Sequence, residues 1–289
     1  MLTLDEEVNL PHALEGLKGR VDDVVIVDSF SKDRTREIAE AWGARFVEHR
    51  FEGHARQWLW GFQSAGLKND WVFMHDPDHR VTPELWDELE RLFQAGIPED
   101  VDGLYVRRRN VFRGKWIRHG GYYPKWMLKI VRNRGVAFDE HEFDYRVYVP
   151  GRTLQLHGDI WEENFKEEAI SFWLQKHIGF ANKQAEEEMF RAEHPESWKV
   201  VPRFFGTPDQ RTLWLKIRWY RLPLYVRPFL YFFFRFFVKL GFLDGKQGIL
   251  FHFLQAFWYR LVVDVRLEEL RGPGSVSYTH LTLPTNREV

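Results

Sequence analysis

Hydrophobic residues in the first third of the chain follow two alternating patterns. Residues 22–28 (DDVVIVD) and 70–76 (DWVFMHD) contain continuous apolar runs of strand length, which is typical of strands buried on both faces of a sheet. Segments with helical spacing or helix-end signals lie around them, at 6–19, 31–44, 54–66 and 82–96. This alternation predicts an α/β fold, a three-layer α/β/α sandwich with a mostly parallel sheet.

The pattern changes after residue 101. Residues 102–114, 125–133 and 145–158 alternate or cluster apolar and polar positions as antiparallel strands do, so the whole sheet is expected to be mixed. Residues 166–193 have the spacing of one long helix. We therefore expect a catalytic or binding domain over 1–195, followed by a helical region over 196–271.

The C-terminal region is aromatic and basic. Between Trp198 and Arg271 there are 13 Lys or Arg against 5 Asp or Glu, and its two long apolar segments are interrupted by Arg235, Lys239, His252 and Arg260. Neither segment reaches the roughly 20 apolar residues that a spanning helix needs. Two amphipathic helices around the LDGK turn at 243–246 are expected instead. Such helices suit a bilayer surface with anionic headgroups. Alternatively, they could form a helical cap that packs on the domain or on a second copy of the chain.

Acidic residues end both apolar strands of the first third. Asp28 ends the first, and Asp76 and Asp78 flank a proline at the end of the second. Asp and Pro form turns, and that interpretation stays open. In parallel sheets, however, ligands bind beyond the carboxyl ends of the strands, where these residues would lie together. Carboxylates one residue apart are also oxygen ligands suited to Mg²⁺ or Mn²⁺.

The composition and motifs of the chain argue against several classes of function. The chain has 41 Lys plus Arg and 42 Asp plus Glu, so its overall charge indicates no nucleic-acid partner. It contains no Cys, which excludes disulfides and cysteine nucleophiles and fits a reducing compartment. No basic stretch followed by an apolar one marks a secretion signal, and no G-x-G-x-x-G follows a strand as in dinucleotide oxidoreductases. The segment 272–289 begins with a Gly-Pro-Gly break and is interpreted as a non-native tail.

Three stretches, TLDEEVNL from Thr3, VVIVDSFSKDRT from Val24 and DWVFMHDPDHRVTPELW from Asp70, resemble the family 2 glycosyltransferases. In that family the corresponding stretches read close to T-L-N-E-E, V-D-S-x-S-x-D-x-T and D-A-D-x-R-x-T-P-E-L. The resemblance implies the nucleotide-diphospho-sugar transferase (GT-A) fold and a divalent Mg or Mn cofactor. It also implies inversion at the transferred sugar.

The resemblance assigns roles to individual residues. Thr3, Glu6 and Asp28 would bind the nucleotide, Asp76 the ribose or the metal, and Asp78 the metal that bridges the diphosphate. A Gly-Gly-Tyr-Pro stretch lies near the acceptor pocket in family members, which implies a sugar or acceptor pocket lined by His119, Gly120 and Tyr123.

Transfer to a hydroxyl also requires a base, because the hydroxyl has a high pKa. The acidic cluster at 138–147 supplies candidates, with Glu142 preferred and Asp139 and Glu140 as substitutes; a solvated acidic loop is the alternative. The basic stretch 107–126 contains seven Arg or Lys and fits a loop that contacts phosphate and acceptor, or a solvated hairpin.

The sequence departs from the family pattern at three places, one of which is Asp5 in the position of the common Asn. Family members have about five apolar residues before the T-L-N-E-E stretch, forming a central strand, so a truncated first strand is expected here. Trp58 and Leu59 replace a basic residue and Asn, and Arg56 is the candidate that replaces the lost charge at the nucleotide.

These observations predict a metal-dependent inverting glycosyltransferase that uses a nucleotide-diphosphate sugar and a lipid-linked or cell-envelope glycan acceptor. We expect it in the bacterial cytoplasm, peripheral on the inner face of the plasma membrane, with no nucleic-acid partner. The alternatives are a non-catalytic sugar-nucleotide-binding or membrane scaffold relative, or a nucleotidyltransferase.

Overall fold

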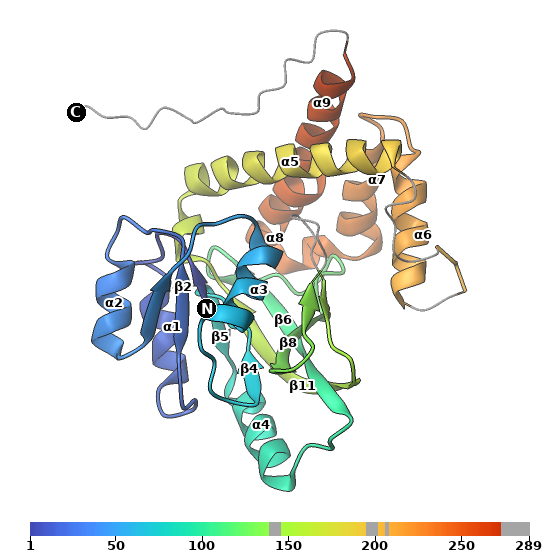
Figure 1. Cartoon of the computed structure of the whole chain (residues 1–289). Coiled ribbons are helices and arrows are strands. Elements are labelled where there is room, and N and C mark those ends of the chain that lie inside the picture. The colour runs from blue at the N-terminus through green and yellow to red at the C-terminus, as the bar shows by residue number, and fades with distance from the viewer. Residues whose placement is uncertain (139–145, 195–201, 206–207, 273–289) are drawn as a thin grey trace, which may run out of the picture.

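The computed structural model describes residues 1–138, 146–194, 202–205 and 208–272. An α/β part forms the N-terminal half, and a group of helices covers one end of it (Figure 1). The interpretation of 272–289 as a tail therefore lies almost wholly outside the described residues, and it stays a prediction.

The first sheet is parallel and has the order β1-β2-β3. Its strands are β1 (Leu2–Thr3), β2 (Val25–Asp28) and β3 (Arg45–Glu48), and its helices are α1 (Leu10–Leu17), α2 (Thr35–Trp42) and α3 (His54–Ser64). Alternate residues of β2 face opposite helices: Ile26 packs with α1 and α2, whereas Val27 lies beside Gly61 of α3. Helices thus cover both faces of this sheet, as the expected three-layer arrangement requires.

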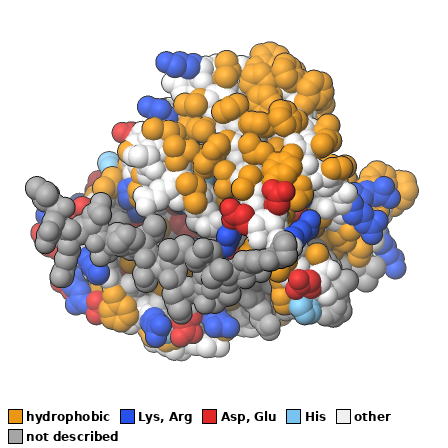
Figure 2. Space-filling model, turned by 90° about the horizontal axis from the view of Figure 1, so that it is seen from above, with side chains coloured by type: hydrophobic (Ala, Val, Ile, Leu, Met, Phe, Trp, Pro, Cys, Tyr) orange, Lys and Arg blue, Asp and Glu red, His pale blue; other side chains and the backbone are white. Residues whose placement is uncertain are grey.

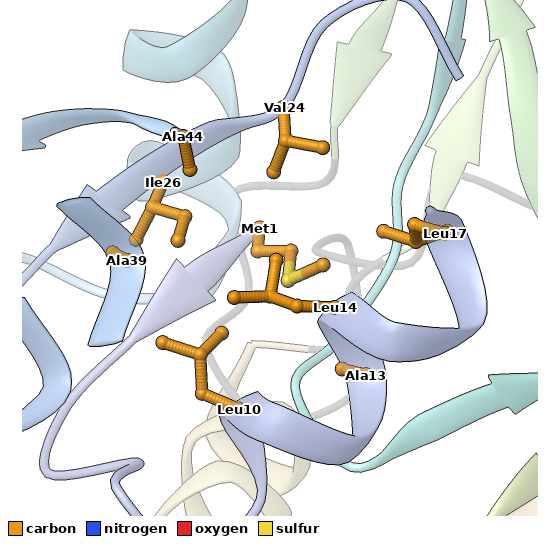
Figure 3. Close-up of a cluster of buried hydrophobic side chains, with 9 residues drawn as sticks. All are labelled: Met1, Leu10, Ala13, Leu14, Leu17, Val24, Ile26, Ala39 and Ala44. Carbon is orange, nitrogen blue, oxygen red and sulfur yellow. The ribbon is translucent and has the colours of Figure 1, made fainter. Parts of the chain in front are cut away.

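Helix α1 forms where the sequence places apolar residues at helical spacing. Leu10, Ala13, Leu14 and Leu17 are all buried, and they pack on Ile26 and the other apolar side chains drawn in Figure 3. Pro11 occupies the first turn, where its missing N–H costs no intrahelical hydrogen bond. The helix begins at residue 10 rather than at residue 6, because residues 2–9 are used by β1 and the turn that follows it.

The second sheet is mixed and has the order β4-β8-β6-β11-β5. Strands β6 and β11 are parallel, and the other neighbours along this path are antiparallel. The strands are β4 (Trp71–Phe73), β5 (His79–Val81), β6 (Val101–Phe112), β8 (Lys125–Arg132) and β11 (Arg152–Glu162); β7 (Lys115–Trp116) pairs with β6, and β9 (Ala137–Phe138) pairs with β10 (Val147–Tyr148).

Helix α4 (Pro83–Ala95) covers one face of the second sheet, where Leu85 and Leu89 pack on residues of β6 and β11. Thr82 caps this helix by accepting a hydrogen bond from the Leu85 amide, as the sequence predicts. Strand β5 was not expected from the sequence, because its three residues follow the Asp-Pro-Asp turn directly. With this strand and helix, the mixed α/β fold class is confirmed.

The C-terminal helices pack against one another and against α5 (Ile170–Glu193), which follows the 3₁₀ turn η1 (Phe165–Glu168). Ala181 and Ala185 of α5 contact Val263 and Leu267, which lie in α9. The remaining elements are α6 (Pro208–Tyr220), α7 (Arg227–Phe233), η3 (Phe234–Val238), η4 (Gly241–Asp244), α8 (Gly245–His252), η5 (Phe253–Trp258) and α9 (Tyr259–Arg271). The turn expected at 243–246 is present between η3 and α8. The domain boundary at 195 stays a prediction.

An ion-pair cluster fixes this group of helices. Arg227 is 2% exposed, and its guanidinium donates to Asp264 and Glu188, each at 2.5 Å. A buried charge is tolerated only when partners satisfy it, so these three residues determine how α5, α7 and α9 meet.

A cavity of about 530 Å³ separates the two sheets. Val25 and Val27 of β2 line one side of it and Val72 and Phe73 of β4 line the other, while Met1 lies at its end. The Met1 amine donates to the Val25 carbonyl at 2.6 Å, and burial lowers the pKa of that amine to about 5. Among the described residues β1 and β4 are edge strands of separate sheets, and each pairs with one neighbour only. The truncated first strand stays a prediction.

Extending the chain before Met1 tests that prediction. Five residues of the pattern Val-Ile-Val-Val-Ile should raise the melting temperature by roughly 5 °C, because burial of apolar side chains would exceed the cost of ordering them by about 1–2 kcal/mol. A five-residue extension of alternating Lys and Glu is the control and should give no increase. An equal melting temperature for the two extensions would show that the cavity does not accept a strand.

Candidate functional site

Asp28 lies at the carboxyl end of β2 and is fully buried. Its two carboxylate oxygens accept hydrogen bonds from the Thr3 hydroxyl at 2.7 Å and from the Ser31 hydroxyl and amide at 2.5 and 2.7 Å. Strand pairing places Thr3 directly beside Asp28. The structure therefore brings together two residues that the resemblance assigns to the nucleotide, and it fixes the carboxylate before any ligand binds.

Asp76 and Asp78 lie in the turn between β4 and β5, and His79 follows them at the start of β5. The His79 Nε2 atom lies 3.4 Å from Asp76, 4.0 Å from Asp78 and 3.4 Å from Glu162, which ends β11. His79 is 1% exposed. Three carboxylates thus surround one buried imidazole; we call these four residues the carboxylate cluster.

Two cations pair with this cluster from neighbouring strands. The Lys129 ammonium of β8 pairs with Asp76, and Arg108 of β6 donates to Glu162 at 2.8 Å. Burial alone would raise the pKa of both carboxyls. The Lys129 charge instead lowers the pKa of Asp76 to about 2, and the Arg108 charge and the His79 hydrogen bond hold the pKa of Glu162 well below its usual range.

Asp78 lacks such a close cation among the described residues. Burial and the nearby charges of Glu162 and Asp76 raise the pKa of Asp78 to about 6, even though His79 opposes this shift. Lys176 of α5 is the next cation, and its ammonium bonds to Glu167 at 2.7 Å. The cluster therefore carries negative charge that its own partners do not fully balance.

The chemistry of this cluster fits a divalent cation. The raised pKa of Asp78 shows that the positive charge around its carboxylate is too small to offset burial and the acidic neighbours. A divalent cation bound by the carboxylate oxygens would supply that charge. Within the described residues no set of three His, Asp or Glu side chains is already arranged as a complete metal site. A bound ion would therefore need further oxygen ligands, such as phosphate or water.

Two other predicted nucleotide residues have partners within the protein. The Glu6 carboxylate accepts from Asn9 and from the Lys166 ammonium, both at 2.7 Å. Arg56 is exposed and lies 3.9 Å from Glu52 of the preceding turn. Glu6 thus braces the loop beside Thr3, and Arg56 is exposed to solvent. The nucleotide roles of both residues stay predictions.

The predicted acceptor residues form a loop that contacts the C-terminal helices. The His119 Nδ1 atom bonds to Asp244 at 2.6 Å, and the Gly120 amide donates to the Lys239 carbonyl at 2.8 Å. Gly120 has φ +71°, and a Cβ there would lie 2.0 Å from the His252 ring, so only glycine fits. The Tyr123 hydroxyl donates to Asp159 at 3.1 Å. His119 borders a pocket, whereas Gly120 is buried.

The candidate bases Glu142, Asp139 and Glu140 lie outside the described residues, so their roles stay predictions. Sequence reasoning missed His79, Glu162 and Lys129, and it named Arg108 only as part of the basic stretch 107–126. Lys129 carried a usable signal, because a lysine inside the apolar strand 125–132 needs a buried carboxylate partner. Glu162 gave no such signal, since its proximity to Asp78 depends on the pairing of β5 with β11.

The family model described as "Glycosyl transferase family 2" matches residues 1–149. The chain belongs to this family. The matched part contains Asp28, Asp76 and Asp78 in the order that the motifs require. The described fold is accordingly the GT-A fold of a family 2 glycosyltransferase.

Of three curated relatives that match parts of the chain, two are named glycosyltransferases. An uncharacterized glycosyltransferase of Rickettsia bellii is 36% identical over 95 residues, which are 33% of this chain and 32% of that protein. One of Rickettsia typhi is 33% identical over 114 residues, which are 39% of this chain and 38% of that protein. A TPR repeat-containing protein of Synechococcus elongatus is 25% identical over 71% of this chain and 50% of its own length. The chain thus spans about a third to a half of the length of these relatives.

Among solved structures, glucosyl-3-phosphoglycerate synthase from Mycobacterium tuberculosis, in complex with Mn²⁺ and uridine-diphosphate-glucose, resembles 38% of this chain. The alignment covers 42% of that chain, at 22% identity and a TM-score of 0.31.

The opposite pKa shifts of Asp76 and Asp78 predict opposite effects of amide substitution in metal-free protein. Asp78→Asn should raise the free energy of unfolding at pH 7.5 by about 2 kcal/mol, because it removes a charge that the fold disfavours. Asp76→Asn should lower it by about 3 kcal/mol, because Lys129 would remain buried without its carboxylate partner. Urea unfolding in EDTA measures both values.

The raised pKa of Asp78 also makes the free energy of unfolding depend on pH. The folded protein retains the Asp78 proton up to about pH 6, whereas the unfolded chain releases it near pH 4, so the Asp78 contribution lowers stability as pH rises through this window. The gain from Asp78→Asn should therefore be absent at pH 4 and complete above pH 6. A gain that does not change with pH would contradict the raised pKa.

Proposed function

We propose that this protein transfers a sugar from a nucleotide-diphosphate donor to a hydroxyl of a lipid-linked or cell-envelope glycan. The observation that carries the proposal is the position of two acidic centres, Asp28 and the carboxylate cluster, at strand ends; Asp28, Asp76 and Asp78 lie within the residues that match family 2. Ligands of α/β sheets bind at such strand ends, so one donor molecule could contact both centres.

Asp28 is proposed to bind the base or ribose of the donor. The hydrogen bonds from Thr3 and Ser31 hold its carboxylate in one orientation, which favours a directional contact over a simple charge interaction. The nucleotide then lies along the ends of β1 and β2, with its diphosphate toward the turn that carries Asp78.

Asp78, assisted by Asp76, is proposed to hold a Mg²⁺ or Mn²⁺ ion against the diphosphate. When bound, such an ion offsets the negative charge that develops on the departing diphosphate. Lys129 and Arg108 hold Asp76 and Glu162 in their ionised forms, and Lys176 adds positive charge from α5. These residues make the site receptive to a ligand that carries both phosphate and metal.

The transfer forms a bond between the acceptor oxygen and the anomeric carbon as the bond to the diphosphate breaks, which inverts the configuration. The hydroxyl proton must pass to a base, and Glu142 is proposed for this role, with Asp139 and Glu140 as substitutes. The nucleoside diphosphate leaves with the electron pair of the broken bond.

Asp78→Asn tests the proposed metal role in catalysis. We expect kcat/KM for Mn²⁺-dependent transfer or donor hydrolysis to fall at least about 100-fold, because charge stabilisation at the leaving group is lost. The panel should contain UDP, GDP and dTDP sugars, and the control is Asp70→Asn, an exposed carboxylate before β4.

A change of less than threefold in Asp78→Asn would contradict the metal assignment. Metal-dependent nucleotide binding by the wild type without turnover of any donor would instead support the non-catalytic alternative.

The exposed side of the C-terminal helices is proposed to bind the membrane. Within the described residues, no helix is long and apolar enough to cross a bilayer. Nevertheless, a large cluster of hydrophobic side chains faces solvent there (Figure 2). We call it the apolar face; it consists of Val226, Phe229, Leu230, Phe233, Phe234, Phe237, Val238, Leu240, Phe242, Leu243, Ile249 and Phe253, each at least 41% exposed.

The other side of the same helices is packed. Phe251 and Leu254 contact Phe112 and Trp173 in a buried cluster, so the helices cap the α/β part and still expose an apolar face. Lys239 and Lys246 are exposed on this region and suit anionic headgroups. Arg235, by contrast, donates to the Gly120 carbonyl at 2.6 Å and is a structural residue.

Phe233→Glu combined with Phe237→Glu tests membrane binding. These side chains are 57% and 49% exposed, and the change should release most protein from vesicles of 30% phosphatidylglycerol in phosphatidylcholine, as measured by co-sedimentation. The control is Phe51→Glu with Phe190→Glu, which adds the same charge at exposed positions elsewhere.

Unchanged co-sedimentation of the Phe233/Phe237 variant would exclude the apolar face as the membrane contact. A change only in oligomeric state would assign the face to a second copy of the chain.

A further inference from the structure

A second pocket, of about 600 Å³, lies across the β5–β11 pair from the carboxylate cluster. In this pair His79 is opposite Glu162, and Arg80 is opposite Trp161. Successive residues of a strand face opposite sides. His79 and Glu162 therefore belong to the cluster, whereas Arg80 and Trp161 line the pocket. The pocket is lined by Arg80, Val111, Gly114, Lys115, Trp116, Arg118, His119, Trp161, Glu163, Leu243 and Asp244.

Two indoles form a rigid wall of this pocket. The ring centres of Trp116 and Trp161 are 5.9 Å apart, and the Arg109 guanidinium lies 4.7 and 4.8 Å from them. Arg109 in turn pairs at 2.5 Å with Asp159, which is 1% exposed. Both indoles are therefore braced by a fixed cation, and each is partly exposed. Aromatic faces held in this way suit the apolar face of a sugar ring.

The charged groups of the pocket do not cancel. Arg80 pairs with Glu163, and His119 pairs with Asp244. Lys115 and Arg118 are exposed, and neither forms an ion pair with any residue that the structure describes. Among the described residues two cations of the pocket thus remain without an acidic partner. Lys115 precedes Trp116 in β7, and Arg118 follows this strand, with its guanidinium 5.5 Å from the centre of the Trp116 ring. Lys and Arg together beside an aromatic wall favour a phosphate attached to a sugar.

We propose that this pocket binds a phosphorylated hexose, with the sugar ring against Trp116 or Trp161 and the phosphate at Lys115 and Arg118. This inference rests on the proposed function, since the ligand would be part of the acceptor. Leu243 belongs to both the pocket and the apolar face. The phosphate could therefore be that of a lipid-linked sugar or of a free sugar phosphate, which share the same polar chemistry.

Calorimetry without donor and with EDTA tests this pocket independently of sugar transfer. The probes are glucose, mannose and galactose 1-phosphates, the parent sugars, inorganic phosphate and octyl phosphodiesters of the same sugars. We expect at least one hexose phosphate to bind at least about tenfold more tightly than its sugar and than inorganic phosphate. Tighter binding of the octyl diester would assign the ligand to a lipid, and equal binding would assign it to a free sugar phosphate.

Lys115→Glu combined with Arg118→Glu should weaken that binding at least about tenfold. The control is Lys18→Glu with Arg91→Glu. These exposed cations lie after α1 and in α4, respectively, and the change should leave hexose phosphate binding unchanged. Absence of binding by every hexose phosphate, or equal loss in both double variants, would overturn the proposal. Sugar transfer by the wild type without such binding would refute the pocket alone, and binding without transfer would refute the proposed function alone.

Discussion

The buried carboxylate cluster depends on cations supplied by neighbouring strands. Burial raises the pKa of Asp76 and Glu162, but the Lys129 charge lowers the pKa of Asp76 to about 2. The Arg108 charge and the His79 hydrogen bond likewise hold the pKa of Glu162 well below its usual range. Each pair joins residues that are far apart in sequence, so the second sheet must be assembled before the cluster exists. Asp78 is the exception, because burial and its acidic neighbours disfavour its charge. A cation bound there would remove this unfavourable interaction, which links the stability of the turn to ligand binding.

Within the described residues, the C-terminal helices are coupled to this α/β part through the loop at 119–120 as well as through packing. His119 and Gly120 bond to Asp244 and to the Lys239 carbonyl, and Arg235 returns a bond to Gly120. Membrane binding at the apolar face would thereby hold the loop beside Trp116 in a fixed position. The arrangement accounts for the glycine at position 120, where any side chain would overlap the His252 ring.

The sequence predicted those parts of the fold that depend on local pattern. The apolar run ending at Asp28 and the capped helix after Thr82 formed as expected, because periodicity and capping act over a few residues. It did not reveal β5 or the role of Glu162, which depend on long-range pairing across 83 residues. Likewise, Arg56 was a candidate only because family members carry a basic residue nearby, and its side chain is exposed, 3.9 Å from Glu52.

The central claim is that Asp28 and Asp78 belong to one site for a nucleoside diphosphate and a divalent cation. Titration calorimetry of UDP, GDP and dTDP into the wild-type protein, with Mn²⁺ and with EDTA, tests it most directly. The account predicts that at least one nucleotide binds, and that its affinity falls at least about tenfold when the metal is removed. Binding that is indifferent to the metal, or no binding by any of the three, would contradict it.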